Sequence, residues 1–392
     1  MTYKLLSKLY YTDKDNYEKI YAQRFNNESA YHFNIKIHDH EAFCQLCPEI
    51  YKLNDEIACL DKRVCEIVHF LPKVAIKQFV RKSLVDEIIL TNDIEGVYST
   101  RREINRILND IQSKYPKDRF WGMVAKYNML GKDEIPLATC EDIRQIYDEL
   151  VLPEIADDDP KNKPDGKLFR KELAEVTSAT QKVIHTGLYP EDKIIDTMEQ
   201  ALKILNNDEI PCLIRVSVFH YLFGYIHPFY DGNGRTSRFI SSYLLSKQFE
   251  YIIGYRLSYT IKENITEYYE GFKICNNPKN LGDLTPFVIM FMNIIKKSFE
   301  NLYEALYIRK EDLIKYHEKI CNIDGIDAEL SYVLLQAALF SRIGVSKQYL
   351  CNLFEISEST LRSKLKDIAK PGYLVLKKEG RIHYYSFDID KI

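Results

Sequence analysis

The sequence predicts a mainly α-helical protein with two or three domains. Apolar residues recur at helical spacing in long stretches such as 213–226 and 328–340. Only short stretches favour β-structure: 183–190 is typical of extended chain with a turn, and 373–378 with 381–387 is typical of a hairpin joined at Glu379-Gly380. A chain of 392 residues is long enough for two or three domains. We expect the segments 1–80, 81–305 and 320–392, with a boundary near 305–325.

Composition and charge argue against several classes of protein. The formal net charge is −3 and the pI about 6.3, so the whole chain has no basic signature of nucleic-acid binding. No apolar run is long enough to cross a bilayer, and Met1 to Lys4 lack the apolar core of a signal peptide. The nine cysteines are scattered and odd in number, which fits reduced thiols. We therefore expect a cytoplasmic protein without membrane contact.

The N-terminal region, 1–80, is expected to be helical. It holds a set of residues from which a zinc site could be drawn: His38, Asp39, His40, Cys44, Cys47, Cys59, Cys65 and His69. The CxxC of this set lacks a second well-spaced pair, and Cys59 and Cys65 lie in a continuous helical pattern. We expect core thiols and surface histidines instead of a metal site.

A helix near 83–96 ends in an unusual way. Leu84, Ile88 and Ile89 have helical spacing, and Gly96 is a natural helix stop. Thr91 and Glu95 are four residues apart and share one face. A glutamate in a last turn is disfavoured by the helix dipole, which indicates a cationic partner for Glu95.

The middle of the chain then becomes less regular. The polar run 157–166 is typical of an exposed loop inside a domain. A less helical stretch opens at Leu168-Phe169-Arg170 and is followed by the extended segment 183–190.

The segment His227–Arg238, HPFYDGNGRTSR, carries most of the chemistry. An apolar helix over 213–226 delivers the chain to His227, and Pro228 prevents an easy continuation. Gly232 and Gly234 permit tight backbone geometry close to a ligand. A new helix follows with Phe239, Ile240, Tyr243 and Leu244 as its buried face. The loop therefore feeds a helix N-terminus, where N–H groups and the dipole favour anions.

The charged side chains of this segment indicate phosphate chemistry. Arg235 and Arg238 are three residues apart and can present two guanidinium forks, and Asn233 can add a donor. Asp231 would repel a bare phosphate, so its presence asks for a divalent cation. His227 is the side chain type best suited to accept a proton near neutral pH.

This segment resembles the signature of the Fic family, HPFxDGNGRxxR, at every defined position. The resemblance implies a Fic-type helical core and a nucleotidyl transferase that moves AMP from ATP to a Ser, Thr or Tyr hydroxyl of a protein. It implies that His227 deprotonates that hydroxyl and that Asp231 binds Mg²⁺ between the α- and β-phosphates. The implied ATP- and phosphate-binding residues are Gly232, Asn233, Gly234, Arg235 and Arg238, with Arg238 on the γ-phosphate.

The segment Thr91–Gly96 resembles the inhibitory motif of the same family, [ST]xxxE[GN]. The resemblance implies that Glu95 pairs with Arg238 and keeps the γ-phosphate from binding productively. Some members use the same glutamate to position a water for removal of AMP, so a de-AMPylating activity stays open.

Two further segments resemble parts of Fic domains. The flap, a short hairpin that adds a target segment as a strand, corresponds to Ile184, His185, Thr186 and Gly187; a plain surface hairpin is the alternative. Tyr268 and Tyr269 lie where the family closes over adenine, and adjacent tyrosines on a helix point in different directions, so we expect one at most to touch the base.

Two other residues have structural interpretations. On the helix over 213–226, His220 is expected to be a satisfied core histidine. Asp283 or Thr285 is expected to cap the last core helix.

The C-terminal region resembles a winged-helix domain. Helices are expected over 328–340 and 345–354, and a third, capped by Ser357 or Ser359, runs to about 369 before the hairpin. Leu361, Leu365 and Ile368 would face its core. The outward face would present Arg362 and Lys366 to DNA, aided by the basic wing of Lys377, Lys378 and Arg381. Protein contacts or homodimerisation are the alternative use.

Together these features predict an ATP- and Mg²⁺-dependent protein adenylyltransferase restrained by Glu95. Two alternatives remain. The protein could be a DNA-binding regulator whose Fic core senses nucleotide, or it could transfer UMP, phosphocholine or phosphate. Gly234 matches the adenylylating pattern, whereas phosphate-transferring relatives carry lysine there.

Overall fold

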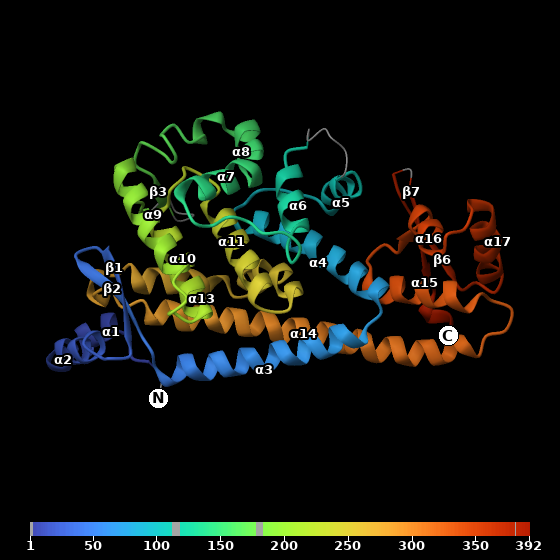
Figure 1. Ribbon diagram of the computed structural model, residues 1–392, viewed down its shortest axis with the longest axis horizontal. Coiled ribbons are helices and arrows are strands. Elements are labelled where there is room, and N and C mark those ends of the chain that lie inside the picture. The colour runs from blue at the N-terminus through green and yellow to red at the C-terminus, as the bar shows by residue number, and fades with distance from the viewer. Residues whose placement is uncertain (1–2, 112–117, 178–182, 381) are drawn as a thin grey trace. The chain divides into compact units, whose positions relative to one another are not determined.

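The computed structural model describes residues 3–111, 118–177, 183–380 and 382–392 (Figure 1). It is mainly helical, which confirms the predicted fold class. Two compact units divide the chain: Met1–Leu60 with Glu87–Phe299, and Asp61–Asp86 with Glu300–Ile392. The chain passes between the units inside three continuous helices, α3 (Pro48–Phe70), α4 (Lys73–Ile94) and α14 (Thr285–Cys321).

The expected segments 1–80, 81–305 and 320–392 remain a prediction, and the two compact units divide the chain at other residues. The expected boundary region 305–325 contains the end of α14 at Cys321.

The first unit opens with two short helices followed by a β-hairpin. The hairpin was not predicted from the sequence. Alternating Phe33, Ile35 and Ile37 point inward along one strand, a period-two pattern in a region expected to be helical. The Phe43 N–H donates to the Gly282 carbonyl (3.1 Å), which anchors the hairpin just before α14. The elements are α1 (Leu6–Thr12), α2 (Lys14–Phe25), β1 (Ala30–Ile37) and β2 (His40–Gln45), with β1 and β2 antiparallel.

The cysteines of the N-terminal set lie in different environments. Cys44 and Cys47 are buried, as expected for core thiols, but Cys59 is exposed because it lies on the outer side of α3. Within the residues that the structure describes, no group of three or more His, Cys, Asp or Glu side chains could hold a metal ion.

The rest of the first unit is a set of packed helices with one small hairpin. Part of the expected loop 157–166 is helical, since it supplies the end of α8 and a 3₁₀ turn, Pro160–Asn162. The helices are α5 (Arg101–Asn109), α6 (Trp121–Asn128), α7 (Cys140–Leu150), α8 (Leu152–Asp158), α9 (Glu191–Leu205), α10 (Cys212–Ile226), α11 (Asn233–Gln248), α12 (Leu257–Glu263) and α13 (Ile265–Cys275). The strands are β3 (Glu175–Thr177) and β4 (Val183–Thr186), and 3₁₀ turns cover Tyr251–Tyr255 and Pro278–Asn280.

Helix α10 forms the centre of this unit. It packs against α9 and α11 (Figure 1), and nearly all of its side chains are buried. On α11, Phe239, Ile240 and Tyr243 are buried as expected, while Leu245 takes the place expected for Leu244. The central position of α10 fixes both its C-terminal end and the loop that follows.

His220 and Asp283 are satisfied structurally, as expected. His220 is buried on α10, with Nδ1 2.8 Å from the Ser241 hydroxyl and Nε2 2.8 Å from the Tyr268 hydroxyl. Burial, aided by the charge of Arg238, lowers the pKa of His220 to about 3. Asp283 accepts the Thr285 N–H (3.0 Å) and so caps α14.

The second unit contains the C-terminal helices and a three-stranded antiparallel sheet in the order β5-β7-β6. Ser357 accepts the Thr360 N–H and caps the third helix, as expected, and Leu361, Leu365 and Ile368 are buried. The strand β5 was not predicted because it is only two residues long, and Arg381 lies outside the described residues. The elements are α15 (Ala328–Phe340), β5 (Val345–Ser346), α16 (Lys347–Phe354), α17 (Glu358–Ala369), β6 (Leu374–Glu379), β7 (Ile382–Phe387) and a 3₁₀ turn, Ile389–Lys391.

No helix in the described part of the chain combines the length and the apolar character needed to cross a membrane.

Candidate active site

His227 terminates α10 in a strained conformation. Its backbone is left-handed (φ 53°), and its N–H still donates to the Phe223 carbonyl (2.9 Å). The ring is half-buried, and burial, followed by the charges of His185 and Arg170, lowers the pKa of His227 to about 3. The imidazole is therefore neutral at physiological pH and can accept a proton.

The loop after His227 is held rigid from within. Gly232 adopts φ 80°, and a Cβ there would lie 2.9 Å from Val151 and 3.1 Å from Tyr147, so both the conformation and the space require glycine. The Asn233 side chain bridges one residue of the loop: its oxygen accepts the Phe229 N–H (3.0 Å) and its amide donates to the Phe229 carbonyl (2.7 Å). Asn233 thus shapes the loop in addition to any contact with an anion.

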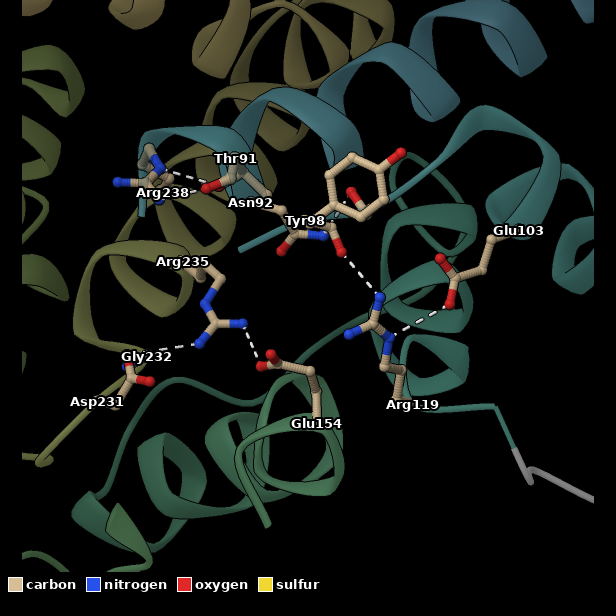
Figure 2. A network of polar contacts seen from close by, with 11 residues as sticks. Thr91, Asn92, Tyr98, Glu103, Arg119, Glu154, Asp231, Gly232, Arg235 and Arg238 are labelled. Atoms are coloured by element: carbon tan, nitrogen blue, oxygen red, sulfur yellow. Dashed lines mark hydrogen bonds and ion pairs between the residues drawn. The ribbon is translucent and has the colours of Figure 1, made fainter. Parts of the chain in front are cut away.

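Arg235 is buried between two carboxylates. Its Nη1 donates to Glu154 at 2.5 Å, and its Nη2 lies 3.5 Å from Asp231 (Figure 2). Glu154 is itself only 4% exposed, so the pair is enclosed by α8 and α11. The pairing of Glu154 with Arg235 was not predicted, because the two residues are 81 positions apart in the sequence. A glutamate on a short helix with no motif around it gives no signal of this pairing.

Asp231 has the more accessible carboxylate, with 41% of its side chain exposed. It accepts the Gly232 N–H and contacts Arg235. Mg²⁺ that acts on nucleotides is usually held by one or two carboxylates together with phosphate and water oxygens. One accessible carboxylate beside a helix N-terminus fits such an ion, and a cage made of protein ligands alone is not needed.

Arg238 is almost completely buried and held by the end of α4. Its Nε and Nη2 donate to the Thr91 hydroxyl and carbonyl, both at 2.9 Å. Its Nη1 lies 2.7 Å from the Glu95 carboxylate. Although burial disfavours the charged guanidinium, the charge of Glu95 raises the pKa of Arg238 overall. Glu95 therefore contacts Arg238, the cationic partner that the family resemblance implied.

Gly234 is needed for that ion pair to form. A Cβ at Gly234 would lie 2.0 Å from Glu95 Oε1 and 2.8 Å from Arg238 Nη1. Any side chain at this position would collide with the carboxylate where it now rests.

Glu87 is a buried carboxylate on α4, eight residues before Glu95. Both of its oxygens accept the Ser258 N–H at the start of α12 (2.8 and 3.0 Å). Burial raises the pKa of Glu87 to about 7, although the Ser258 hydrogen bonds and Arg238 oppose this. In the sequence, the helix near 83–96 shows only the apolar spacing of one face, which gives no signal of a role for Glu87.

The predicted flap residues lie on β4 and just after it. β3 and β4 pair antiparallel, with Glu175 opposite Thr186, and residues 178–182 between them lie outside the described chain. Ile184 is 54% exposed, whereas the ring of His185 turns inward and its Nε2 lies 2.7 Å from the Tyr225 carbonyl. Gly187 donates its N–H to the Ala174 carbonyl (3.0 Å).

The two candidate adenine residues have different environments. Tyr268 is buried and bound to His220, whereas Tyr269 is 51% exposed. Only Tyr269 of the two offers an accessible ring face to a ligand.

Residues 137–245 match the model of the Fic/DOC family. The chain contains a Fic domain. It includes α7 to α10, the strands β3 and β4 and most of α11, and therefore the complete segment His227–Arg238. Glu95, Glu87 and the second compact unit lie outside the residues matched to the Fic domain.

Relatives of the Fic domain are named as transferases. Protein adenylyltransferase Fic of Drosophila melanogaster is 36% identical over 106 residues, which are 26% of this chain and 20% of that protein. The protein of the same name from Drosophila erecta is 33% identical over 106 residues, which are again 26% of this chain and 20% of that protein. The matched region thus spans about a fifth of the curated relatives' length.

The fold of a solved Fic protein extends over more of the chain. The crystal structure of a Fic family protein from Desulfovibrio desulfuricans G20 is similar with a TM-score of 0.51 at 19% identity, and the similarity covers 88% of this chain and 97% of that one. At this identity the similarity shows a shared fold.

Proposed function

We propose that this protein transfers AMP from ATP to a hydroxyl group of a protein and that Glu95 restrains the reaction. The observation that carries the proposal is the position of a neutral His227 beside the N-terminus of α11, where Arg238 is already held by Glu95. The relatives of the Fic domain carry the adenylyltransferase name, which supports the same reaction class.

The proposed chemistry is a single in-line displacement. The His227 ring accepts the proton of the target hydroxyl, whose oxygen forms a bond to the α-phosphorus of ATP. The bond between that phosphorus and the bridging oxygen to the β-phosphate breaks, and pyrophosphate leaves. Positioning and charge neutralisation supply most of the rate in such transfers.

The residues around the phosphates have separable proposed roles. N–H groups at the start of α11, around Gly232 and Gly234, face the phosphate oxygens. Arg235, already paired with Glu154, orients Asp231 and adds positive charge near the phosphates. Asp231 would hold Mg²⁺, which would supply neutralisation of phosphate charge.

The proposed restraint is competition for Arg238. The γ-phosphate requires a guanidinium that Glu95 now occupies at 2.7 Å, and the carboxylate would repel the phosphate at short range. Because 27% of the Glu95 side chain is exposed, the carboxylate can move into solvent when ATP displaces it.

Intact mass tests the proposal directly. The variant Glu95→Gly, incubated with ATP, Mg²⁺ and candidate targets, should gain one or more AMP masses on itself or a target, well above the wild type. The double variant Glu95→Gly, His227→Ala is the matched control and should gain none, since removal of a general base costs about 10²- to 10⁴-fold. A gain in the double variant equal to that of the single variant would contradict the role of His227.

The same measurement decides which group is transferred. UMP, phosphocholine and phosphate add masses that differ from that of AMP, so a panel of donors separates them. Removal of AMP by the wild type from a product made by Glu95→Gly would support a de-AMPylating role for Glu95.

A second candidate function is DNA binding by the second unit. Arg362 and Lys366 are exposed on one face of α17, and in the described residues neither has an ion-pair partner. Exposed, unpaired cations on the last helix of a helix-turn-helix suit contact with phosphates. DNA binding that weakens with salt and is lost in the Arg362→Ala, Lys366→Ala variant would support this function; no binding at low salt would reject it.

A further inference from the structure

Arg170 is a buried guanidinium without a carboxylate partner. Its side chain is 0% exposed, like that of a core residue. The two buried arginines of the Fic signature, Arg235 and Arg238, each contact a glutamate. Within the described residues no carboxylate lies in ion-pair range of Arg170. Burial lowers its pKa, yet an arginine stays charged, so this charge must be stabilised in another way.

Backbone carbonyls supply that stabilisation. Nε donates to the carbonyl of His227 at 2.8 Å, and Nη2 lies 3.5 Å from the carbonyl of Ile226. These groups end α10, where the helix dipole places partial negative charge. The Arg170 N–H also donates to the Pro228 carbonyl (3.1 Å), so the backbone and the side chain of Arg170 both hold the catalytic loop.

The same guanidinium holds both ends of the flap. Nη1 donates to the carbonyl of Glu172, before β3, at 2.5 Å. Nη2 donates to the carbonyl of Leu188, after β4, at 2.8 Å. The N–H of Leu188 donates in turn to the Ile226 carbonyl (3.1 Å). One side chain therefore joins the segment before β3, the segment after β4 and the end of α10.

The packing around this side chain leaves little freedom. A Cβ at Gly187 would lie 2.4 Å from Arg170 Nη2 and 2.9 Å from the His227 Cβ. Gly187 thus permits the flap to lie directly against the guanidinium and the catalytic histidine.

We propose that Arg170 is a positioning residue that fixes the distance and orientation between the flap and His227. A target held along β4 must present its hydroxyl to the His227 ring, so that separation decides whether the proton and the α-phosphorus are both within reach. This role rests on the proposed adenylyl transfer, and it adds a residue outside the signature to the machinery of that reaction.

The test compares three variants in the Glu95→Gly background. Arg170→Gln removes the charge and most of the donors. Arg170→Lys retains the charge but has one nitrogen in place of a fork. Arg144→Gln is the matched control, because Arg144 also donates to a nearby carbonyl (Leu168, 2.9 Å) but contacts neither His227 nor β4. The readouts are kcat and the KM for ATP, and hydrogen exchange at the Gly187 and Leu188 amides of the full chain without nucleotide.

Arg170→Gln should lower kcat roughly 100-fold, the effect of misplacing reacting groups by about 1 Å, while the KM for ATP changes less than about twofold. The Leu188 amide should exchange at least about tenfold faster, since the carbonyl of the same residue loses its anchor and the flap can then move away from the Ile226 carbonyl that the amide contacts. Arg170→Lys should lie between Arg170→Gln and the parent. Arg144→Gln should resemble the parent in all readouts.

Several results would overturn the proposal. They are an unchanged kcat, an equal loss in kcat and ATP affinity, or unchanged exchange at Leu188 in a folded Arg170→Gln variant. If Arg170→Gln fails to fold by circular dichroism, Arg170→Lys decides by the same criteria. If the Glu95→Gly parent transfers no AMP, the proposed function fails, and amide exchange alone then decides whether Arg170 holds the flap.

Discussion

Replacing Glu87 by glutamine should remove a pH-dependent weakness in the docking of α4. Glu87 is fully buried, and its carboxyl faces the Ser258 N–H at the start of α12. Burial raises the pKa of Glu87 from 4.5 to about 7. Below pH 4.5 the carboxyl is protonated in both the folded and the unfolded state. As pH rises from 4.5 to about 7, the unfolded state loses its proton first, so the folded state loses stability.

The structure sets the magnitude of that loss. At about 1.4 kcal/mol per pKa unit, the interval between the two pKa values corresponds to about 3 kcal/mol. Between pH 5 and pH 8 the expected loss is about 2 to 3 kcal/mol. A neutral glutamine keeps the shape and one acceptor and cannot ionise, so Glu87→Gln should lack this component.

Urea denaturation of the wild type and Glu87→Gln at pH 5 and pH 8 measures the difference, because other titrating groups cancel in the comparison. Glu191→Gln is a control of opposite sign. Three backbone N–H groups, of Lys167, Leu168 and Phe169, lower the pKa of Glu191 against the effect of its burial, so its contribution is present above pH 4.5 and is constant from pH 5 to 8. If Glu87→Gln keeps the pH dependence of the wild type, the buried carboxyl is not the source and the reasoning is refuted.

Three other substitutions test neighbouring parts of the structure. Gly234→Ala should lower stability by about 1–3 kcal/mol in the wild type and by less in the Glu95→Gly background, because the added Cβ collides with the Glu95 carboxylate in the first and keeps only the contact with Arg238 Nη1 (2.8 Å) in the second; equal thermal shifts in the two backgrounds would argue against the collision with the carboxylate. Tyr269→Ala should weaken ATP binding about two- to tenfold if its exposed ring stacks on adenine, and calorimetry that shows an unchanged Kd would remove it from the site. Arg24→Met should cost about 3 kcal/mol in chemical denaturation, because Asp283 keeps a buried charge without its cation (3.2 Å); a cost under about 1 kcal/mol would show that hydrogen bonds alone satisfy it.

Features that depend on residues close together in the chain could be predicted from the sequence. The segment His227–Arg238 contains its own turn residues and lies between two periodic helices, so the end of α10 and the start of α11 could be placed from local rules. The capped third helix of the C-terminal region could be placed in the same way, since Ser357 caps its own chain.

Apart from the Glu95–Arg238 pair, which the family resemblance implied, contacts between distant segments could not be predicted. Glu154 and Arg235 are 81 residues apart, and Thr91 and Arg238 are 147 apart. Nothing local marks Arg170 as buried, because its partners are carbonyl groups, which every residue carries. The hairpin β1–β2 was missed for another reason: its alternating pattern is short and lies between helical stretches.

Burial also distinguishes two arginine–glutamate ion pairs that have similar distances. Arg235 and Arg238 are both buried, and each contacts one glutamate, at 2.5 and 2.7 Å. The side chain of Glu154 is 5% exposed, so separating it from Arg235 would leave a buried charge unpaired, at a cost of about 3–5 kcal/mol. The side chain of Glu95 is 27% exposed and follows the last residue of α4, so it can leave Arg238 and regain water. Arg238 would then need a new anion, and the γ-phosphate of ATP is the one the proposed reaction brings. The same chemistry thus makes one pair a fixed part of the fold and the other an exchangeable contact, and only the exchangeable pair is suited to restrain the proposed reaction.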